Sequence, residues 1–149
     1  MKKTASILIA ILFTVLLQAQ QPFTKDQQAV QQTVVNMFEA LSNRDSVKLK
    51  LYCAKDITLY EYGLAWNMDS LITRAISLNT STDYKRTNTL DFINTTVNNN
   101  TAWANYHLQS YISRDSKHST VEWIETVILE KEKNSWKIKV LHSTLIKRS

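Results

Sequence analysis

The sequence VEWIETVILEK, at residues 121–131, is followed after a short polar segment by WKIKVLHSTLI, at residues 136–146. Both stretches are rich in β-branched and aromatic residues, which favour extended strands. The polar segment between them is short enough for a hairpin turn, so the two strands are expected to pair antiparallel. The C-terminal end of the chain is therefore predicted to be a β-hairpin.

Two further stretches of the same character precede this hairpin, at residues 84–97 and 102–112. Polar turns separate them from each other and from the hairpin: Asn98-Asn99-Asn100 and Arg114-Asp115-Ser116-Lys117. Short links of this kind again favour antiparallel neighbours. The second half of the chain is thus expected to form four long antiparallel strands.

The first half reads mainly as helix. Thr24 and Gln27 have the spacing of a capping box, and the apolar residues that follow recur every three or four positions, as on one face of a helix: Val30, Val34, Met37, Phe38 and Leu41. This first helix is expected to end near Ser42. A second helix, capped by Asp45 or Ser46, is expected to continue through Cys53.

The period of the sequence changes at Asp56, where alternating residues predict a strand through Tyr62. Gly63 is the only glycine of the chain and predicts a turn that needs positive φ, followed by a short return strand at residues 64–66. Asn67 is expected to cap a third helix whose inward face carries five apolar side chains: Leu71, Ile72, Ala75, Ile76 and Leu78. Three helices followed by an antiparallel sheet indicate an α+β fold with the helices on one face.

The N-terminal segment has the layout of a secretory signal. Lys2 and Lys3 precede an apolar stretch at residues 7–17, and Ala19 offers a small residue for cleavage. A retained membrane anchor is the alternative, although the stretch is shorter than the roughly 20 residues of a spanning helix. We expect a signal peptide at residues 1–19, one domain at residues 20–149, a periplasmic or extracellular destination, and no membrane association after cleavage.

Composition argues against several kinds of site. The net charge is +5, but no run of Lys and Arg marks a nucleic-acid surface, and a single glycine excludes glycine-rich phosphate loops. The histidines at positions 107, 118 and 142 lack the paired spacing of metal ligands. Cys53 stands alone among apolar residues and is expected to be a buried thiol. No metal, cofactor or nucleic-acid partner is expected.

Two parts of the sequence resemble one known superfamily. In the first half these are FEALSNRD at residues 38–45, Leu51, Ala54-Lys55-Asp56 and Gly63. In the second half they are TVILEK at residues 126–131, WKI at residues 136–138, and His142-Ser143. Together they resemble the nuclear transport factor 2-like (NTF2-like) superfamily, in its SnoaL-like and ketosteroid isomerase-like branch. The resemblance implies a cone-shaped, cystatin-like roll, with three helices on a strongly bent antiparallel sheet.

The same resemblance implies a pocket at the open end of the cone and, often, a homodimer formed through the sheet. The superfamily includes isomerases, dehydratases, cyclases and binding domains, so fold alone does not choose among them. The sequence has no clear match to the catalytic base and oxyanion-hole residues of the isomerases.

His142 is the candidate catalytic residue. Strict alternation along the last strand would place it on the same face as Trp136, Ile138 and Val140, opposite the lysines at positions 137, 139 and 147. If the lysines face water, His142 faces the pocket, where an imidazole could act as a general base. A hydrogen-bonded core histidine is the alternative.

The strand at residues 102–112 offers a second set of candidates. One face carries Trp103, Asn105, His107, Gln109 and Tyr111, which could contact a ligand with hydrogen-bonding groups beside aromatic walls. The other face carries Ala102, Ala104, Tyr106, Leu108 and Ser110. Neither face is cleanly apolar, so the sequence leaves open which one lines the pocket.

Further ligand-binding candidates come from other strands. Tyr60 and Tyr62 flank Glu61 on the short hairpin expected at the pocket rim, where a phenol could donate to a ligand oxygen. Glu125 lies among apolar neighbours, where burial could raise its pKa, although an outward Glu paired with a lysine is the alternative. The tryptophans at positions 66, 103, 123 and 136 could form an aromatic pocket wall, Trp136 being included among the ligand contacts, or simply core.

Three functions are compatible with these patterns. The first is an exported domain that binds a small, mainly apolar ligand in a conical pocket. The second is an isomerase, dehydratase or cyclase that uses His142. The third is a dimeric interaction module, suggested by Leu141 and Leu145 on the expected outer face of the last strand.

Overall fold

The computed structural model describes residues 23–149, so the predicted signal peptide at residues 1–19 lies outside the described residues. The elements follow in this order: α1 (Lys25–Ser42), α2 (Ser46–Tyr52), β1 (Cys53–Glu61), β2 (Leu64–Trp66), α3 (Met68–Ile72), a π-helical segment (Thr73–Ser77), β3 (Lys85–Asn98), β4 (Thr101–Arg114), β5 (Lys117–Glu132) and β6 (Ser135–Arg148). In this part of the chain, no helix combines the length and the apolar character needed to cross a membrane.

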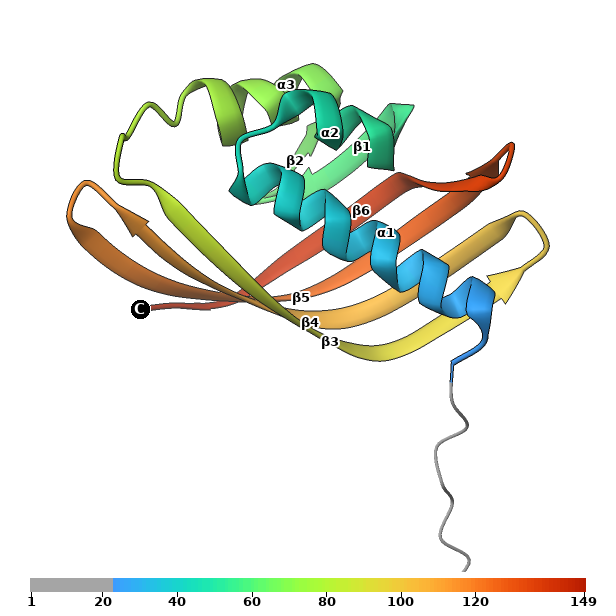
Figure 1. Cartoon of the computed structure of the whole chain (residues 1–149). Helices are drawn as coiled ribbons and strands as arrows, with labels where there is room; N and C mark the ends of the chain where they lie inside the picture. The colour runs from blue at the N-terminus through green and yellow to red at the C-terminus, as the bar shows by residue number, and fades with distance from the viewer. Residues whose placement is uncertain (1–22) are drawn as a thin grey trace, which may run out of the picture.

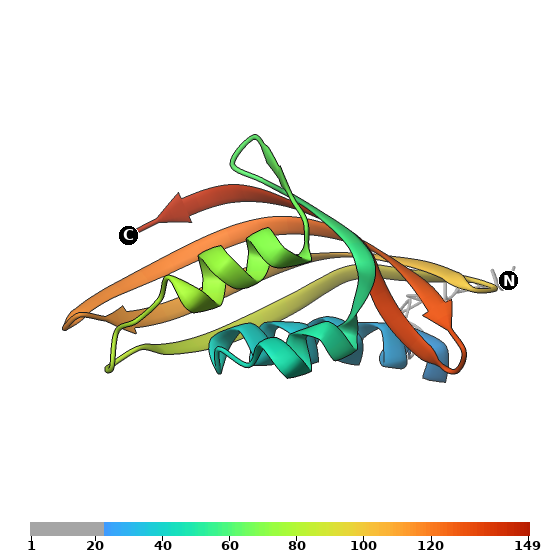
Figure 2. The same ribbon diagram turned by 90° about the horizontal axis from the view of Figure 1, so that it is seen from above.

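The strands form one six-stranded sheet in the order β2-β1-β6-β5-β4-β3. The three hairpins among β3, β4, β5 and β6 are antiparallel, as predicted. The pairing of β1 with β6 is parallel, so the sheet is mixed and not wholly antiparallel. Figure 1 shows the long strands curving beneath α1, and Figure 2 shows the helices gathered on one side of the sheet. The predicted α+β arrangement is confirmed.

Local hydrogen bonds start the helices where the sequence indicates. The Thr24 hydroxyl accepts from the backbone N–H of Gln27 at 3.2 Å, and the Gln27 side chain accepts from the backbone N–H of Thr24 at 2.8 Å. Asp45 caps α2 by accepting from the Lys48 N–H at 2.9 Å. The prediction that α2 includes Cys53 is wrong, because Cys53 already pairs with β6 and begins β1.

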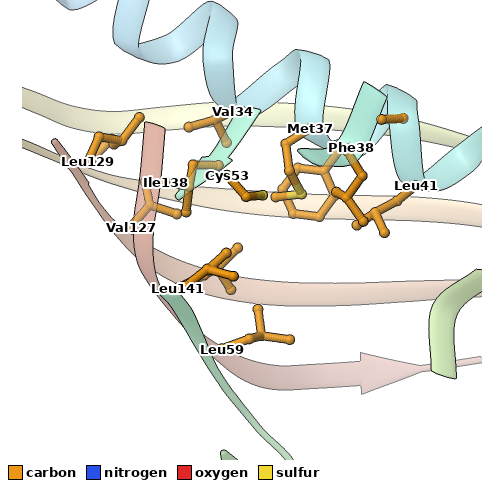
Figure 3. Close-up of a cluster of buried hydrophobic side chains, with 14 of the residues drawn as sticks. Val34, Met37, Phe38, Leu41, Cys53, Leu59, Val127, Leu129, Ile138 and Leu141 are labelled. Atoms are coloured by element: carbon orange, nitrogen blue, oxygen red, sulfur yellow. The ribbon is translucent and has the colours of Figure 1, made fainter. Parts of the chain in front are cut away.

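The core lies between α1 and the inner face of the sheet. Figure 3 shows side chains of α1, among them Val34 and Met37, pointing towards Ile138 and Leu141 of β6. Cys53 belongs to this cluster and is 4% exposed, which confirms the predicted buried thiol. Burial raises the pKa of the thiol to about 12, so it is held in its protonated form.

Gly63 forms the turn between β1 and β2. Tyr62 and Gly63 have φ values of 50° and 73°, the pair of positive values that a type I′ hairpin turn requires. The prediction of a positive-φ turn at Gly63 is confirmed. After β2, α3 continues into the π-helical segment, and Leu78 at its end is 70% exposed. The prediction that Leu78 faces inward is therefore wrong. It assumed the regular α-helical repeat, which does not hold through the π-helical segment and its end.

A bulge in β6 changes which of its residues face the helices. Ile138 pairs with Leu129 and Val140 pairs with Ile128, so Lys139 is an extra residue without a partner on β5. One extra residue moves the side chains that follow it to the opposite face, here as far as a second irregularity at Ile146. Trp136 and Ile138 point inward before the bulge, and the buried residues after it are Leu141 and Ser143.

Candidate functional site

A pocket of about 90 Å³ opens between α1, β1, α3 and the inner face of the sheet. Its apolar wall consists of Met37, Phe38, Leu41, Ile57, Leu59, Leu71, Ala75, Leu108 and Leu141. Its remaining lining residues are Glu61, Trp66, Arg86, Trp123, Glu125 and Ser143. An apolar cavity with a few convergent polar groups is the usual make-up of a small-molecule site.

Glu125 is the central polar residue of the pocket. Its side chain extends from the inner face of β5, and the residue is 4% exposed. The Ser143 hydroxyl donates to Glu125 Oε1 at 2.7 Å, while Glu125 Oε2 has no hydrogen-bond partner among the described residues. A buried carboxyl oxygen without a partner is costly, so a bound group that donates to it would stabilise the site.

Burial raises the pKa of Glu125 from 4.5 to about 7. The hydroxyls of Ser143 and Tyr106 act in the opposite direction, the negative charge of Glu61 raises the pKa further, and Arg86 lowers it. The carboxyl group therefore changes protonation near neutral pH, where it could donate to or accept from a ligand.

Glu61 and Arg86 bring charge to the same pocket. Burial raises the pKa of Glu61, and the positive charges of Arg86 and Arg148 oppose that rise. Arg86 lies over the ring of Phe38 and over that of Trp123, with its guanidinium carbon 5.7 Å from each ring centre. The guanidinium thus forms part of the wall between the aromatic interior and the solvent side.

Three donor groups near Glu125 also lack partners. The indole nitrogens of Trp66 and Trp123 are buried and make no hydrogen bond within the described part of the chain; the buried Tyr106 hydroxyl lies near enough to Glu125 to lower the pKa of that carboxyl, but not in hydrogen-bond geometry. Both tryptophans line the pocket. Since buried donors are nearly always satisfied, the indoles indicate a ligand or water that accepts hydrogen bonds.

The structure corrects the prediction for His142. This residue is exposed and lies on the sheet face opposite the helices, paired with Thr126 of β5. The physical reason is the bulge at Lys139, which reverses the alternation on which the prediction rested. Leu141 is 2% exposed on the inner face, so its predicted outward position is wrong for the same reason.

The structure shows which face of β4 is buried. Ala102, Ala104, Tyr106, Leu108 and Ser110 are buried beneath α1 and Phe92. Trp103, Asn105, His107, Gln109 and Tyr111 therefore lie on the outer face, away from the pocket. Asn105 donates there to Thr126 at 2.6 Å, and the Tyr111 ring stacks on His118.

The remaining candidates fall in three places. Glu125 lies in the pocket, where burial raises its pKa. Tyr60 and Tyr62 are 45% and 53% exposed on the rim hairpin and do not line the pocket, whereas Glu61 between them does. Trp136 is buried in the core beyond the pocket, where Lys131 lies over its ring.

Sequence reasoning singled out Trp66 and Trp123 only as two of four tryptophans, and it missed Arg86. Arg86 alternates with Asn88 and Leu90 on the half-buried face of β3, which was the one available signal. Among the described residues, no group of three His, Cys, Asp or Glu side chains could hold a metal ion.

Comparison with known proteins places the fold. No family model matches the chain, and no curated protein matches it significantly. A conserved protein from Planctomyces limnophilus has a similar structure, with a TM-score of 0.73 at 13% identity over 81% of this chain and 98% of that one. An NTF2-like protein from Cytophaga hutchinsonii gives 0.70 at 12% identity, over 83% and 100%.

A ketosteroid isomerase-like protein from Erwinia carotovora atroseptica gives a TM-score of 0.66 at 12% identity, covering 84% of this chain and 99% of that one. At such identities the likeness shows the fold alone. The chain therefore has the NTF2-like fold, a cone of three helices on a six-stranded mixed sheet, with NTF2-like and ketosteroid isomerase-like proteins as structural neighbours.

Proposed function

We propose that this protein binds a small, mainly apolar molecule in the pocket beneath α1. The observation that carries the proposal is an apolar wall enclosing the unpaired Oε2 of Glu125 and the indole nitrogens of Trp66 and Trp123. Buried polar atoms usually have partners; Trp136 also has an unpaired indole nitrogen, but unlike Trp66 and Trp123 it does not line the pocket. A ligand that accepts from the indoles and meets the Glu125 carboxyl would satisfy all three.

The pocket is the right size for a compact ligand. At about 30 Å³ for each water, a volume of about 90 Å³ holds roughly three water molecules, which a single ring or short chain could displace. Release of water from the apolar wall would supply most of the affinity, while the polar groups would fix the orientation.

Native mass spectrometry of the protein purified from its own host tests the proposal. We expect an extra mass on each chain, lost in Ala75→Phe because the added ring fills the pocket. Ala65→Phe is the matched control, since Ala65 is exposed on β2 outside the pocket. An extra mass that survives Ala75→Phe, or an empty wild-type protein that takes up no small apolar probe, would contradict the proposal.

A second candidate is an enzyme that moves a proton, as an isomerase, dehydratase or cyclase does. It is favoured by the pKa of about 7 at Glu125, which suits a general acid or base. In the described part of the chain, the pocket wall contains no His, Lys or Cys, so Glu125 takes the role that the sequence suggested for His142. A rate that rises with ionisation near pH 7 is expected, and Glu125→Gln should abolish it while His142→Ala leaves it unchanged.

The outer sheet face supports a proposed homodimer. Trp103, Ile124 and Ile128 are between 38% and 40% exposed, and Trp103 is paired directly with Ile128 across β4 and β5. Burying these side chains against a second copy would remove apolar surface from water. Ile128→Lys should yield monomers in sedimentation, whereas Val47→Lys on exposed α2 should not; a wild-type monomer would refute the dimer.

Export remains a proposal that rests on residues 1–19. The positive start, the apolar stretch and Ala19 support it. Sequencing the N-terminus of protein recovered outside the cytoplasm should show cleavage after Ala19, and an uncleaved protein confined to the cytoplasm would contradict it.

A further inference from the structure

A second cavity adjoins the pocket at the open end of the cone. It has a volume of about 480 Å³ and shares Ala75 and Arg86 with the inner pocket. Five basic side chains line it, and we call them the basic mouth: Arg74, Arg86, Arg114, Lys117 and Arg148. Among residues 23–149, Asp115 is the only acidic residue in its lining.

The basic mouth is assembled from distant parts of the chain. Its residues come from the π-helical segment, β3, β4, β5 and β6, and the curvature of the sheet brings them to one end of the pocket. Like charges gathered in one cavity repel each other, and no run of basic residues in the sequence accounts for the gathering. A bound anion would relieve that repulsion.

Arg86 is held in place at the junction of the two cavities. Its Nε donates to Asn88 at 2.8 Å, and its Nη2 donates to the Ser110 hydroxyl at 2.9 Å. Ser110 donates in turn to Asn88 at 2.7 Å, and Asn88 donates to Ser42 of α1. The Nη1 of Arg86 makes no hydrogen bond among the described residues, so a fixed guanidinium retains an unused donor group.

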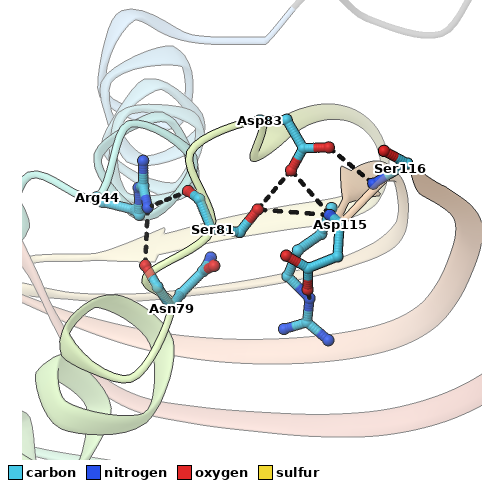
Figure 4. A network of polar contacts seen from close by, with 7 residues as sticks. Arg44, Asn79, Ser81, Asp83, Asp115 and Ser116 are labelled. Carbon is cyan, nitrogen blue, oxygen red and sulfur yellow. Dashed lines mark hydrogen bonds and ion pairs between the residues drawn. The ribbon is translucent and has the colours of Figure 1, made fainter.

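A polar network fixes the rim that carries Arg114 and Lys117. Figure 4 shows Asp83 reaching the turn between β4 and β5, where its carboxylate accepts from the N–H of Asp115 at 2.8 Å and that of Ser116 at 2.7 Å. Both turn residues have positive φ, at 52° and 59°, although neither is glycine. The bonds to Asp83 therefore help to hold a turn of unfavourable backbone geometry.

The acids near the basic mouth do not neutralise it. Arg114 pairs with Asp115 at 3.7 Å, Glu61 acts at longer range on Arg86 and Arg148, and Glu125 acts on Arg86. Arg148 donates to the Tyr62 hydroxyl, a neutral partner, and Arg74 lies over the Trp66 ring at 5.1 Å. Lys117 takes part in no ion pair within the described residues. The mouth therefore keeps an excess of positive charge.

We propose that the ligand is an amphiphilic organic carboxylate, with its apolar body in the inner pocket and its carboxylate in the basic mouth against Arg86. This inference rests on the proposed binding function and names the class of molecule bound. A carboxylate suits the site because a planar guanidinium donates to it in matching geometry. The stacked positions of Arg74 and Arg86 over Trp66 and Trp123 would place the head group directly beside the aromatic wall.

Calorimetric titration with a matched pair of probes tests the inference. The probes are 3-phenylpropanoate and 3-phenylpropanamide, which share the apolar body and differ in the charge of the head group. We expect the carboxylate to bind at least about tenfold more tightly, because charge-assisted hydrogen bonds are stronger than neutral ones. Added salt should weaken the binding of the carboxylate and leave that of the amide unchanged.

Two sets of variants locate the head group. Arg86→Gln should remove most of the preference for the carboxylate. Since Arg86 also joins the network around Ser110, the exposed pair Arg74→Gln and Arg148→Gln provides an independent test and should lower carboxylate affinity roughly two- to fivefold. The pair Lys25→Gln and Lys133→Gln removes the same charge away from the mouth and should have no such effect.

The outcomes separate the two proposals. Equal affinity for the two probes, or a preference untouched by both sets of arginine variants, would overturn the carboxylate inference while leaving apolar binding intact. If neither probe binds and Ala75→Phe does not alter the mass seen in native mass spectrometry, the proposed binding function itself fails.

Discussion

Replacement of Glu125 by Gln should change how the stability of this protein depends on pH. The pKa of Glu125 is raised by burial from 4.5 to about 7 in the folded protein. Between these values the unfolded chain releases its proton while the folded protein keeps it, so the free energy of unfolding falls as the pH rises. Above pH 7 both states are ionised, and the loss is complete.

The size of the effect follows from the same pKa values. A difference of about 2.5 pH units at about 1.4 kcal/mol each corresponds to a loss of about 3 kcal/mol between pH 4.5 and pH 8. Gln keeps the size of the side chain and can still accept from Ser143. Its amide group would face the region of the unpaired Tyr106 hydroxyl. Glu125→Gln should therefore come close to the wild type at pH 4.5 and exceed its stability by about 3 kcal/mol at pH 8.

Urea denaturation at a series of pH values between 4.5 and 8 measures this directly. Glu61 has a pKa raised in the same direction, so some slope should persist in Glu125→Gln and vanish in the double variant with Glu61→Gln. Glu130→Gln is the control, because it removes the same charge from an exposed position on β5. Parallel curves for the wild type and Glu125→Gln would refute the reasoning.

Three further predictions concern positions away from the pocket. Gly63→Ala should destabilise the protein by about 1 to 2 kcal/mol in thermal unfolding, because φ is +73°. An added methyl group would meet no other described residue within 4 Å apart from the two chain neighbours, so the cost comes from the backbone and not from a clash. Gly63→Asn should cost less, and equal losses would contradict a backbone cause. Asp83→Asn should lower the melting temperature at pH 7. Hydrogen bonds that the Asp83 carboxylate accepts from Ser81 and from the turn hold its pKa at about 2. The difference in melting temperature between Asp83→Asn and the wild type should therefore disappear as the pH falls through that value. A difference that persists below pH 2 would refute this role of Asp83. Cys53 should resist iodoacetamide at pH 8 until urea unfolds the chain, and rapid labelling of the folded protein would show that the thiol is accessible.

The predictable parts of the fold depend on short-range interactions. Thr24 and Asp45 cap helices through backbone N–H groups three residues away, so their signals lie within one turn of chain. Gly63 likewise meets a local backbone demand. The hairpin turns are equally local, which explains why the order of the elements was predicted correctly.

The candidate site was predicted less well, because pocket residues are chosen by long-range packing. Glu125 was identified because its neighbours in sequence are apolar, and burial then gave it the raised pKa. Nothing in the sequence near Arg86 indicates that it meets Glu61, Trp66 and Trp123, which lie on other elements. His142 was misplaced because a bulge cannot be read from alternation that looks unbroken.

By itself, the sequence determined the helix starts, the turn at Gly63, the four long strands and hence the α+β class. Only the tertiary structure decided which face of β4 is covered, since both faces mix apolar and polar residues and α1 buries the one that carries Tyr106. The parallel pairing of β1 with β6 was also decided at this level, as was the extra residue at Lys139. Periodicity separates the two faces of a strand, but what packs against each face depends on contacts between residues far apart in the chain.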